Sequence, residues 1–569
     1  MCAAYCSNAY DRGLPPVPQV TTAWVKPASP ITGLDHLGVA AIAISLYNNL
    51  LPGINNVTDR AAYYTFYPWF LWTCENRGAL KREEFIEFFR RADCLFTLIA
   101  AWHGRGNEEH LHGLRMVGRD TLVPALEEIV SGKPLKLSRF TGLEQSEARY
   151  FKNPTGGLGQ YYLGTLRDLN ILRGDLQQGF KFTDQCGRPI ADAVCTRLDR
   201  NEFWKVIASD VIDLKTLDAL VAFCPCQLKH SASERSLLID LFFNRPGVFA
   251  SELGEQRRTT LALMLDLVAN LEMSAPASSP NLDLVGMFRS CVYAGALPDG
   301  KPWALPPEME TQRERWGVYQ RHELLSVAVQ TLFWAALDNL FNAGGVTESR
   351  ATFGASFVSE FCHPVFGRSS KALFAKTVQS VQAQLPDLRD WTSDEHEINE
   401  AWNLLSLSFS NADKDTRIEA VRCATRILLA MAARESLARD PYHGLLDRPD
   451  YQTSFYPINL ISFRHAVSSI WPTLTMEQWL FWLITNWGLD VHFKVALRKL
   501  RTEMKDTFRI RPADDGLRVI SPVAPGFSAP RLSQAVQILS DIGIIDTDAG
   551  KKKASLTTFG REMLQVQRA

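Results

Sequence analysis

The sequence predicts a mainly α-helical protein with two small modules, in each of which a helix is followed by a two-stranded hairpin and a second helix. Three observations lead to this fold class. Apolar residues recur with helical spacing over most of the region from 33 to about 511. Two distant stretches share one order of helix, strand, turn, strand and helix. The composition, 46% hydrophobic and 22% charged over 569 residues, is that of a globular chain with about four domain-sized units.

The first two predicted units are a flexible N-terminal segment, 1–32, and a helical domain, 33–135. The first is rich in Pro and Ser and lacks the basic start and apolar run of a secretion signal. The second contains three runs with helical spacing, GVAAIAISLYNNLL, RAAYYTFYPWFLWTCEN and KREEFIEFFRRADCLFTLIAAW. Pro52-Gly53 and Asn76-Arg77-Gly78 mark the breaks between these predicted helices.

An aromatic stripe in the second of these runs raises three possibilities: a membrane anchor, a platform for stacked bases, or core. The stretches 37–51 and 61–72 are shorter than the ~18 residues that span a bilayer. A stacking platform interleaves aromatic residues with Arg or Lys, and 61–72 contains no charged residue. We therefore predict a buried helical hairpin, with Pro68 producing a kink or a turn. The stripe on the helix consists of Tyr63, Phe66, Tyr67 and Phe70.

The predicted modules, 136–200 and 525–569, match each other in sequence. Residues 166–172 align with 539–545, and Gly187 and Gly560 each lie 19 residues after the aligned Asp168 and Asp541. Each stretch predicts an amphipathic helix, a left-handed Asn or Gly, two short strands around a polar turn, and a Thr-capped helix.

This order resembles the second half of a winged helix, of the kind that ends in LT..G in many bacterial regulators. In the second module the ending is Leu556-Thr557-Thr558-Phe559-Gly560. The first module departs from it by one residue, so its cap register stays open. The resemblance implies two winged-helix modules on a multi-helical scaffold. The region between them, 201–490, is predicted to be a multi-helical domain without a coiled coil or a fixed-period repeat.

Positive charge gathers at the carboxyl end of the sequence. The formal net charge of the chain is −1, but 491–569 carries fourteen Lys and Arg against eight Asp and Glu, a net +6. The stretch 491–524 is predicted to be a basic helix followed by an extended connector. Four cations repeat along one face of that helix, and four apolar residues, Phe493, Leu497, Leu500 and Met504, repeat beside them. Such a helix can pack by its apolar side and present its cations to a phosphate backbone.

Three lysines occupy the predicted tip of the second hairpin, where a winged helix meets phosphate, and one arginine lies near the start of its recognition helix. We therefore predict a surface for duplex nucleic acid, with DNA the expected type and no base-specific reading. Its residues are Lys494, Arg498, Arg501, Lys505, Arg531, Lys551, Lys552 and Lys553. The alternative for these modules is protein contact alone.

Two clusters of possible metal ligands have the wrong spacing for known motifs. The stretch CPCQLKH holds Cys224, Cys226 and His230, and it lacks paired CxxC spacing. The stretch HGRGNEEHLH lacks the HExxH spacing of a helical zinc site. We therefore predict no metal and no cofactor, with buried thiols and surface histidines instead. The second stretch contains His103, Glu108, Glu109, His110 and His112.

No catalytic residue emerges from the sequence. The glycines of NPTGGLGQYY are not followed by the Lys-Ser/Thr of a P-loop. An enzyme would need a site assembled from distant residues, such as His103 with Glu108 and His110. The 11 cysteines, an odd number without regular spacing, indicate a reducing environment, and we expect a cytoplasmic protein without a membrane anchor.

The stretches LLPGINNVTDRAAYYTFYPW and HFKVALRKLRTEMKDTFRIRPADDGLRV resemble uncharacterised bacterial proteins encoded beside helicases and phospholipase-D-like nucleases in antiphage defence islands. The resemblance implies a non-catalytic component of an antiviral defence complex, with helicase or nuclease partner proteins. The leading hypothesis is thus a nucleic-acid-binding scaffold or adaptor. One alternative is a protein-docking subunit that does not touch nucleic acid, and a second is a metal-dependent nuclease or hydrolase.

Overall fold

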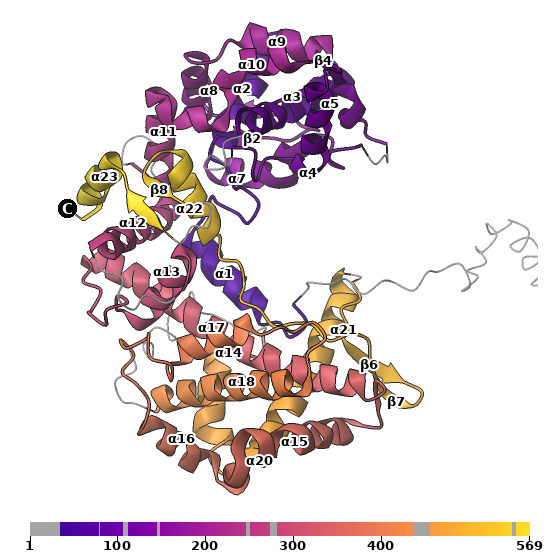
Figure 1. The fold of residues 1–569 in the computed structure, drawn as a ribbon, viewed down its shortest axis with the longest axis vertical. Helices are drawn as coiled ribbons and strands as arrows, with labels where there is room; N and C mark the ends of the chain where they lie inside the picture. Colours follow the sequence, from indigo (N-terminus) through magenta and orange to yellow (C-terminus); the bar gives the residue numbers. More distant parts are fainter. Residues whose placement is uncertain are drawn as a thin grey trace, which may run out of the picture.

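The computed structural model describes residues 35–78, 80–105, 112–144, 148–245, 251–273, 281–436, 456–503, 505–548 and 553–568, so the predicted segment 1–32 lies outside it. The described residues are mainly helical, as predicted, and their strands form four small sheets. Figure 1 shows an N-terminal lobe, residues 55–245, and a helical lobe, residues 281–520. Helices α1 (Ala40–Leu50) and α12 (Glu252–Met273) lie between the two lobes.

The N-terminal lobe is built on the predicted aromatic stripe. Helix α2 buries Tyr63, Phe66 and Tyr67, and the ring of Phe66 stacks on that of Phe96 in α3 with centroids 4.1 Å apart. The prediction of a buried aromatic core is therefore confirmed. Helix α2 continues through Pro68, so the predicted turn at this residue is wrong.

The elements of this lobe, in chain order, are α2 (Tyr63–Glu75), α3 (Arg82–His103), α4 (Arg119–Leu122), η2 (Val123–Ala125), α5 (Leu126–Val130), β1 (Leu135–Lys136), α6 (Ser138–Thr141), η3 (Leu158–Tyr162), α7 (Leu163–Asp168), β2 (Leu172–Arg173), β3 (Lys181–Phe182), α8 (Gly187–Cys195), α9 (Arg200–Ser209), β4 (Val211–Ile212), α10 (Leu214–Ala219), η4 (Val221–Phe223), η5 (Pro225–His230) and α11 (Ala232–Phe242). Strand β1 pairs with β4, Leu135 opposite Ile212. The lobe therefore extends past residue 200, where the sequence suggested a division.

The helical lobe surrounds the long helix α14, which packs against α1, α12, α13 and α18. Its elements are α13 (Leu284–Ala294), α14 (Pro307–Asn342), β5 (Val346–Thr347), α15 (Arg350–Phe366), η6 (Gly367–Lys371), α16 (Phe374–Gln382), α17 (Glu397–Ser406), α18 (Lys414–Glu435), α19 (Leu460–His465), η9 (Ala466–Ile470), α20 (Met476–Trp482), η10 (Leu483–Asp490), α21 (Val491–Glu503), β6 (Ile510–Ala513) and β7 (Gly516–Val519). Side-chain caps start several of them: Asp283 accepts from the Gly286 N–H at α13, and Asp413 from the Thr416 N–H at α18.

Helix α14 is long and apolar enough to cross a membrane by length and composition. Most of that apolar stretch, 83%, is nevertheless buried inside the molecule. The core of the helical lobe accounts for this burial, and among the described residues no other helix passes the same test.

The two aligned modules form the same elements and the same turn. The second, which we call the terminal module, contains α22 (Leu532–Asp541), β8 (Ile545–Thr547), β9 (Ala554–Leu556) and α23 (Thr558–Arg568). Its counterpart is α7, β2, β3 and α8. The first helix of each ends at a left-handed residue, Asn170 with φ 54° and Gly543 with φ 69°. The next residue in each, Ile171 or Ile544, then donates its N–H to the helix, at 2.8 and 2.9 Å.

A threonine joins hairpin and second helix in both modules. The hydroxyls of Thr183 and Thr557 donate to the carbonyl of the left-handed residue, at 2.5 and 2.9 Å. Each hydroxyl also accepts the N–H of a glycine, Gly187 at 3.2 Å and Gly560 at 3.0 Å. The extra residue of the first module is accommodated here, because the Thr183 hydroxyl accepts a second N–H from Cys186. The predicted internal resemblance therefore extends to individual hydrogen bonds.

Candidate functional site

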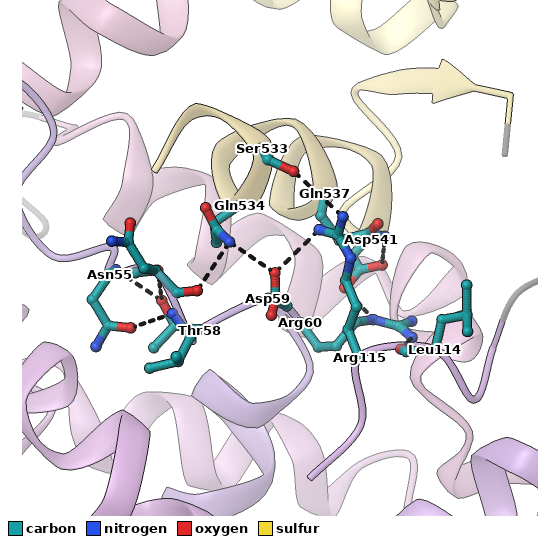
Figure 2. A network of polar contacts seen from close by, with 12 residues as sticks. Asn55, Thr58, Asp59, Arg60, Leu114, Arg115, Ser533, Gln534, Gln537 and Asp541 are labelled. Carbon is teal, nitrogen blue, oxygen red and sulfur yellow. Dashed lines mark hydrogen bonds and ion pairs between the residues drawn. The ribbon is translucent and has the colours of Figure 1, made fainter. Parts of the chain in front are cut away.

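The polar side of α22, the predicted recognition helix, is occupied by another part of the same chain. Figure 2 shows α22 lying over the segment 55–60 that precedes α2. The Arg60 guanidinium donates to the Asp541 carboxylate at 2.9 Å, and both side chains are only 6% exposed. The Ala61 N–H reaches the same carboxylate oxygen at 2.9 Å. Burial alone would lower the pKa of Arg60, but the charge of Asp541 and the hydrogen bond to it leave that pKa raised.

Further contacts extend this interface along the helix. Gln534 donates to the Asn56 carbonyl at 3.0 Å and to the Asp59 carboxylate at 3.1 Å. Arg115 donates to Asp59 at 3.1 Å and to the Ser533 hydroxyl at 3.4 Å (Figure 2). The side of α22 that would face a DNA groove is therefore in contact with the N-terminal lobe.

Arg531, the predicted groove contact, is also engaged inside the molecule. Its guanidinium donates to the Asn48 side chain at 2.5 Å and lies over the Tyr47 ring, 5.2 Å from its centroid. Burial lowers the pKa of Arg531, while Tyr47 and Asp168 act in the opposite direction. A groove contact would require Arg531 to leave both partners.

The basic helix α21 presents an exposed face that mixes cations and leucines. Lys494 and Arg501 are exposed, and Arg498 is half-buried with its guanidinium 5.1 Å from the centre of the Tyr456 ring. Within the described part of the chain, these three cations have no ion-pair partner. Leu497 and Leu500 lie on the same side and are 57% and 41% exposed. The predicted packing side is therefore wrong for these two leucines.

The side of α21 that does pack consists of Val491, His492, Val495, Ala496 and Lys499. His492 donates through Nδ1 to the His36 carbonyl at 3.0 Å and accepts the Arg509 N–H through Nε2 at 2.9 Å. Burial lowers the pKa of His492 to about 4, so the ring is neutral. The sequence pattern missed this side because its buried polar groups, His492 and Lys499, look solvent-exposed in a hydropathy pattern.

The remaining predicted cations fall into two separate places. Lys505 lies just beyond the end of α21 and is half-buried. Lys553 is exposed beside β9, and Lys551 and Lys552 lie outside the described residues. Figure 1 places the β8–β9 hairpin between the lobes and α21 at the far side of the helical lobe, so the two groups do not form one continuous surface.

The hairpin that follows α21 carries two more exposed cations. Strands β6 and β7 pair so that the exposed Arg511 and Arg518 stand directly opposite each other, and β5 completes the sheet. Asp515 pairs with Arg518 at 2.7 Å. We call the exposed side chains of α21 together with Arg511 and Arg518 the cationic corner. Figure 1 shows that α21, β6 and β7 protrude together.

The two stretches whose spacing did not fit a known metal motif, CPCQLKH and HGRGNEEHLH, come together in the N-terminal lobe. His103 ends α3, His112 follows it, and Cys224 and Cys226 flank the start of η5. The two Nδ1 atoms are 3.2 Å apart, His112 Nδ1 is 3.5 Å from Cys224 Sγ, and His103 Nδ1 is 3.4 Å from Cys226 Sγ. All four ligand atoms lie within 4.8 Å of one another.

The other members of those stretches take no described part in this cluster. His230 is exposed, and Glu108, Glu109 and His110 lie outside the described residues. A hydrogen bond from Cys224 is the main cause that lowers the pKa of Cys226, with His112 and His103 adding to the effect. The Gln227 side chain also donates to Cys226 Sγ at 3.6 Å. Neither stretch alone has a recognisable motif, because each supplies half of one cluster.

A cavity of about 930 Å³ lies between α15, η6 and α20. Its lining includes Cys362, His363, Lys371 and Glu477, and the last two form an exposed ion pair. Burial raises the pKa of the Cys362 thiol, so the thiol of this cavity is not an activated nucleophile.

No known protein family, curated protein or solved structure matches the chain.

Proposed function

We propose that this protein is a non-catalytic helical scaffold that binds duplex nucleic acid through the cationic corner. The observation that carries the proposal is the row of Lys494, Arg498 and Arg501 on the exposed face of α21, without carboxylate partners in the described part of the chain. Arg511 and Arg518 add two exposed cations on the hairpin that follows α21. Unpaired cations at helical spacing follow a phosphate backbone and need no base contact.

In this proposal the two modules are winged helices that pack rather than read DNA. Their element order supports the winged-helix assignment, and the contacts of Asp541, Gln534 and Ser533 use the side of α22 that would otherwise enter a groove. Membership of an antiviral defence complex, with helicase or nuclease partner proteins, stays a prediction of the sequence resemblance.

The test is fluorescence anisotropy of a labelled duplex titrated with the protein at several salt concentrations. Each phosphate contact contributes about −0.9 to the slope of log K against log salt. The triple variant Lys494→Glu, Arg498→Glu and Arg501→Glu should therefore weaken binding at least about tenfold and reduce the slope by about three.

The matched control makes the same charge change on the N-terminal lobe, with Lys133→Glu, Lys136→Glu and Lys205→Glu. All three lysines are exposed, and the control should bind as the parent does. Equal loss of affinity in both triple variants would show that only the net charge matters and would refute a localised site.

A second candidate, docking of an acidic amphipathic partner protein, is favoured by the exposure of Leu497 and Leu500 beside the cations. Contacts with phosphate groups would leave these leucines exposed, whereas an amphipathic partner helix would bury them. The double variant Leu497→Ser and Leu500→Ser separates the two candidates. Unchanged affinity for the duplex supports the nucleic-acid proposal. Absence of duplex binding by the parent, with loss of a co-purifying partner from the serine variant, supports docking.

A further inference from the structure

We propose that His103, His112, Cys224 and Cys226 bind one structural zinc ion. The inference is independent of the cationic corner. It contradicts our sequence-based expectation of no metal, and it rests on the way two segments more than a hundred residues apart bring four ligand atoms together.

The spacing of the ligand atoms fits a tetrahedron around zinc. With Zn–S near 2.3 Å and Zn–N near 2.05 Å, tetrahedral angles place nitrogen and sulfur about 3.6 Å apart and two nitrogens about 3.4 Å apart. The structure has 3.4 and 3.5 Å for two of the four nitrogen–sulfur pairs and 3.2 Å for the nitrogen pair, and all the ligand atoms lie within 4.8 Å of one another, so a small movement of the side chains completes the tetrahedron. Both histidines use Nδ1, so their rings turn the same atom towards one point.

The chemistry of the ligands selects the ion. Two thiolates and two imidazoles in a tetrahedral arrangement suit Zn²⁺, which is borderline soft and has no geometric preference of its own. Two thiolates would also neutralise the charge of the ion, which suits a site where Cys224 is buried and the other three ligands are half-buried. All nine cysteines in the described residues are free thiols, so Cys224 and Cys226 are available.

Four protein ligands fill the tetrahedron and leave no position for water or substrate. A catalytic zinc site keeps one position open, so the arrangement indicates a structural ion. The alternative of a metal-dependent hydrolase built around His103 loses its support, because the clustered partners of His103 are a second histidine and two cysteines.

The position of the cluster suggests what the ion would hold together. It would tie the end of α3 and the residues around His112 to the start of η5, and η5 packs against α22. The His112 carbonyl accepts from Arg60 at 2.7 Å, and Arg60 in turn pairs with Asp541 of α22. Zinc would therefore fix the surface on which the terminal module docks.

Metal analysis of the purified full-length protein is the first test. We expect one zinc per chain, and Cys226→Ser and His112→Asn should each lower bound zinc at least tenfold. Two matched controls should keep it: His230→Asn, which changes the exposed histidine of the same stretch, and Cys195→Ser, which removes a half-buried thiol elsewhere. A parent without metal, or equal zinc in all four variants, would overturn the proposal.

Cobalt substitution of the parent gives a second measurement that needs no variant to fold. Co²⁺ bound at this site should give visible bands of tetrahedral intensity together with thiolate-to-cobalt charge-transfer bands. Octahedral spectra without charge transfer, or a Cys224–Cys226 disulfide found by mass spectrometry in protein purified under reducing conditions, would overturn the assignment.

Hydrogen exchange tests the proposed role of zinc in docking. Removal of zinc should raise exchange at 112–115 and in α22, and unchanged exchange at both places would refute that role.

Discussion

Asp93, in the middle of α3, is a carboxyl group enclosed by hydrogen-bond donors. It accepts from the Tyr67 hydroxyl at 3.1 Å, the Tyr150 hydroxyl at 3.2 Å and the Gly157 N–H at 2.9 Å. Burial raises the pKa of Asp93 to about 6, although these three donors and Arg90 act in the opposite direction. Desolvation therefore outweighs a full set of donors at this residue.

The raised pKa makes Asp93 a source of pH-dependent stability. The folded chain holds this proton more tightly than the unfolded chain, whose Asp pKa is about 3.9. The contribution is therefore complete below pH ~4 and is lost as the pH rises to about 6, a change on the order of 2–3 kcal/mol. Asp93→Asn should flatten the unfolding free energy over this range in urea titrations.

The control for Asp93 is Asp184→Asn, whose carboxyl group is exposed. It should retain the slope of the parent between pH 4 and 6. If the unfolding free energy of Asp93→Asn changes with pH as steeply as that of the parent, another group is responsible.

For single residues, the sequence predicts burial or exposure better than it predicts which residues come into contact. The burial of Tyr67 follows from an uncharged aromatic stripe, and the exposure of Lys494 from its helical position. The Cys and His cluster could not be recognised, because Cys224 and His112 are 112 residues apart and only the fold brings them together. The only signal in the sequence is that each of two distant stretches contains two possible metal ligands, His103 with His112 and Cys224 with Cys226.

In both modules the second helix begins in close contact with the backbone just before the first strand of the hairpin. A Cβ on Gly560 would lie 2.1 Å from the Ile544 carbonyl oxygen, and one on Gly187 would lie 2.3 Å from the Ile171 carbonyl oxygen. Backbone atoms cannot move aside as a flexible side chain can. Both modules therefore need glycine at the same place for the same reason.

Gly560→Ala and Gly187→Ala should each lower the free energy of unfolding by roughly 2–3 kcal/mol, because the helix must shift away from the strand. The matched control is Gly164→Ala in α7, where a Cβ meets open space. Helix propensity predicts that this control is neutral or stabilising by about 0.5–1 kcal/mol. Thermal unfolding of the three variants measures the difference. Equal stability of Gly560→Ala and Gly164→Ala would contradict the clash.

The elements themselves were largely predictable, whereas the faces by which they pack were not. Periodicity gave α22 and β8 close to their observed positions, since their apolar positions repeat clearly. The same reasoning put Leu497 and Leu500 of α21 inside, yet both are exposed. Val495 and Ala496 pack instead, and Val495 lies so close to Gly38 that a Cβ there would be 3.2 Å from its Cγ2.

For the molecule as a whole, the terminal module joins regions far apart in the sequence. Asp541 holds Arg60 in the N-terminal lobe, and Arg561 and Arg568 of α23 pair with Glu272 and Asp266 of α12, at 2.8 and 2.6 Å. The sequence predicted the module but could not predict this docking, since long-range partners leave no local pattern.

Asp541→Asn should loosen the module without unfolding either lobe. Removing one partner of a buried ion pair leaves the Arg60 charge uncompensated and costs about 3–5 kcal/mol. Hydrogen exchange should therefore rise in α22, α23 and the segment 55–62, and stay unchanged in α14. The control Asp546→Asn alters an exposed carboxylate of the same module and should leave exchange as in the parent. Parental exchange in Asp541→Asn would mean that the remaining contacts suffice.

Asp541 follows Arg60 by 481 positions in the sequence, and this separation has a consequence for synthesis. A ribosome adds about 5–20 residues per second, so Arg60 leaves the exit tunnel roughly 25–100 s before its carboxylate partner. Throughout that interval Asp59, Arg60 and Arg115 of the nascent N-terminal lobe are exposed, because α22, which covers them in the folded protein, has not yet been synthesised. We therefore expect the final closure to follow chain release, and chaperones that shield growing chains to act longest on this strip.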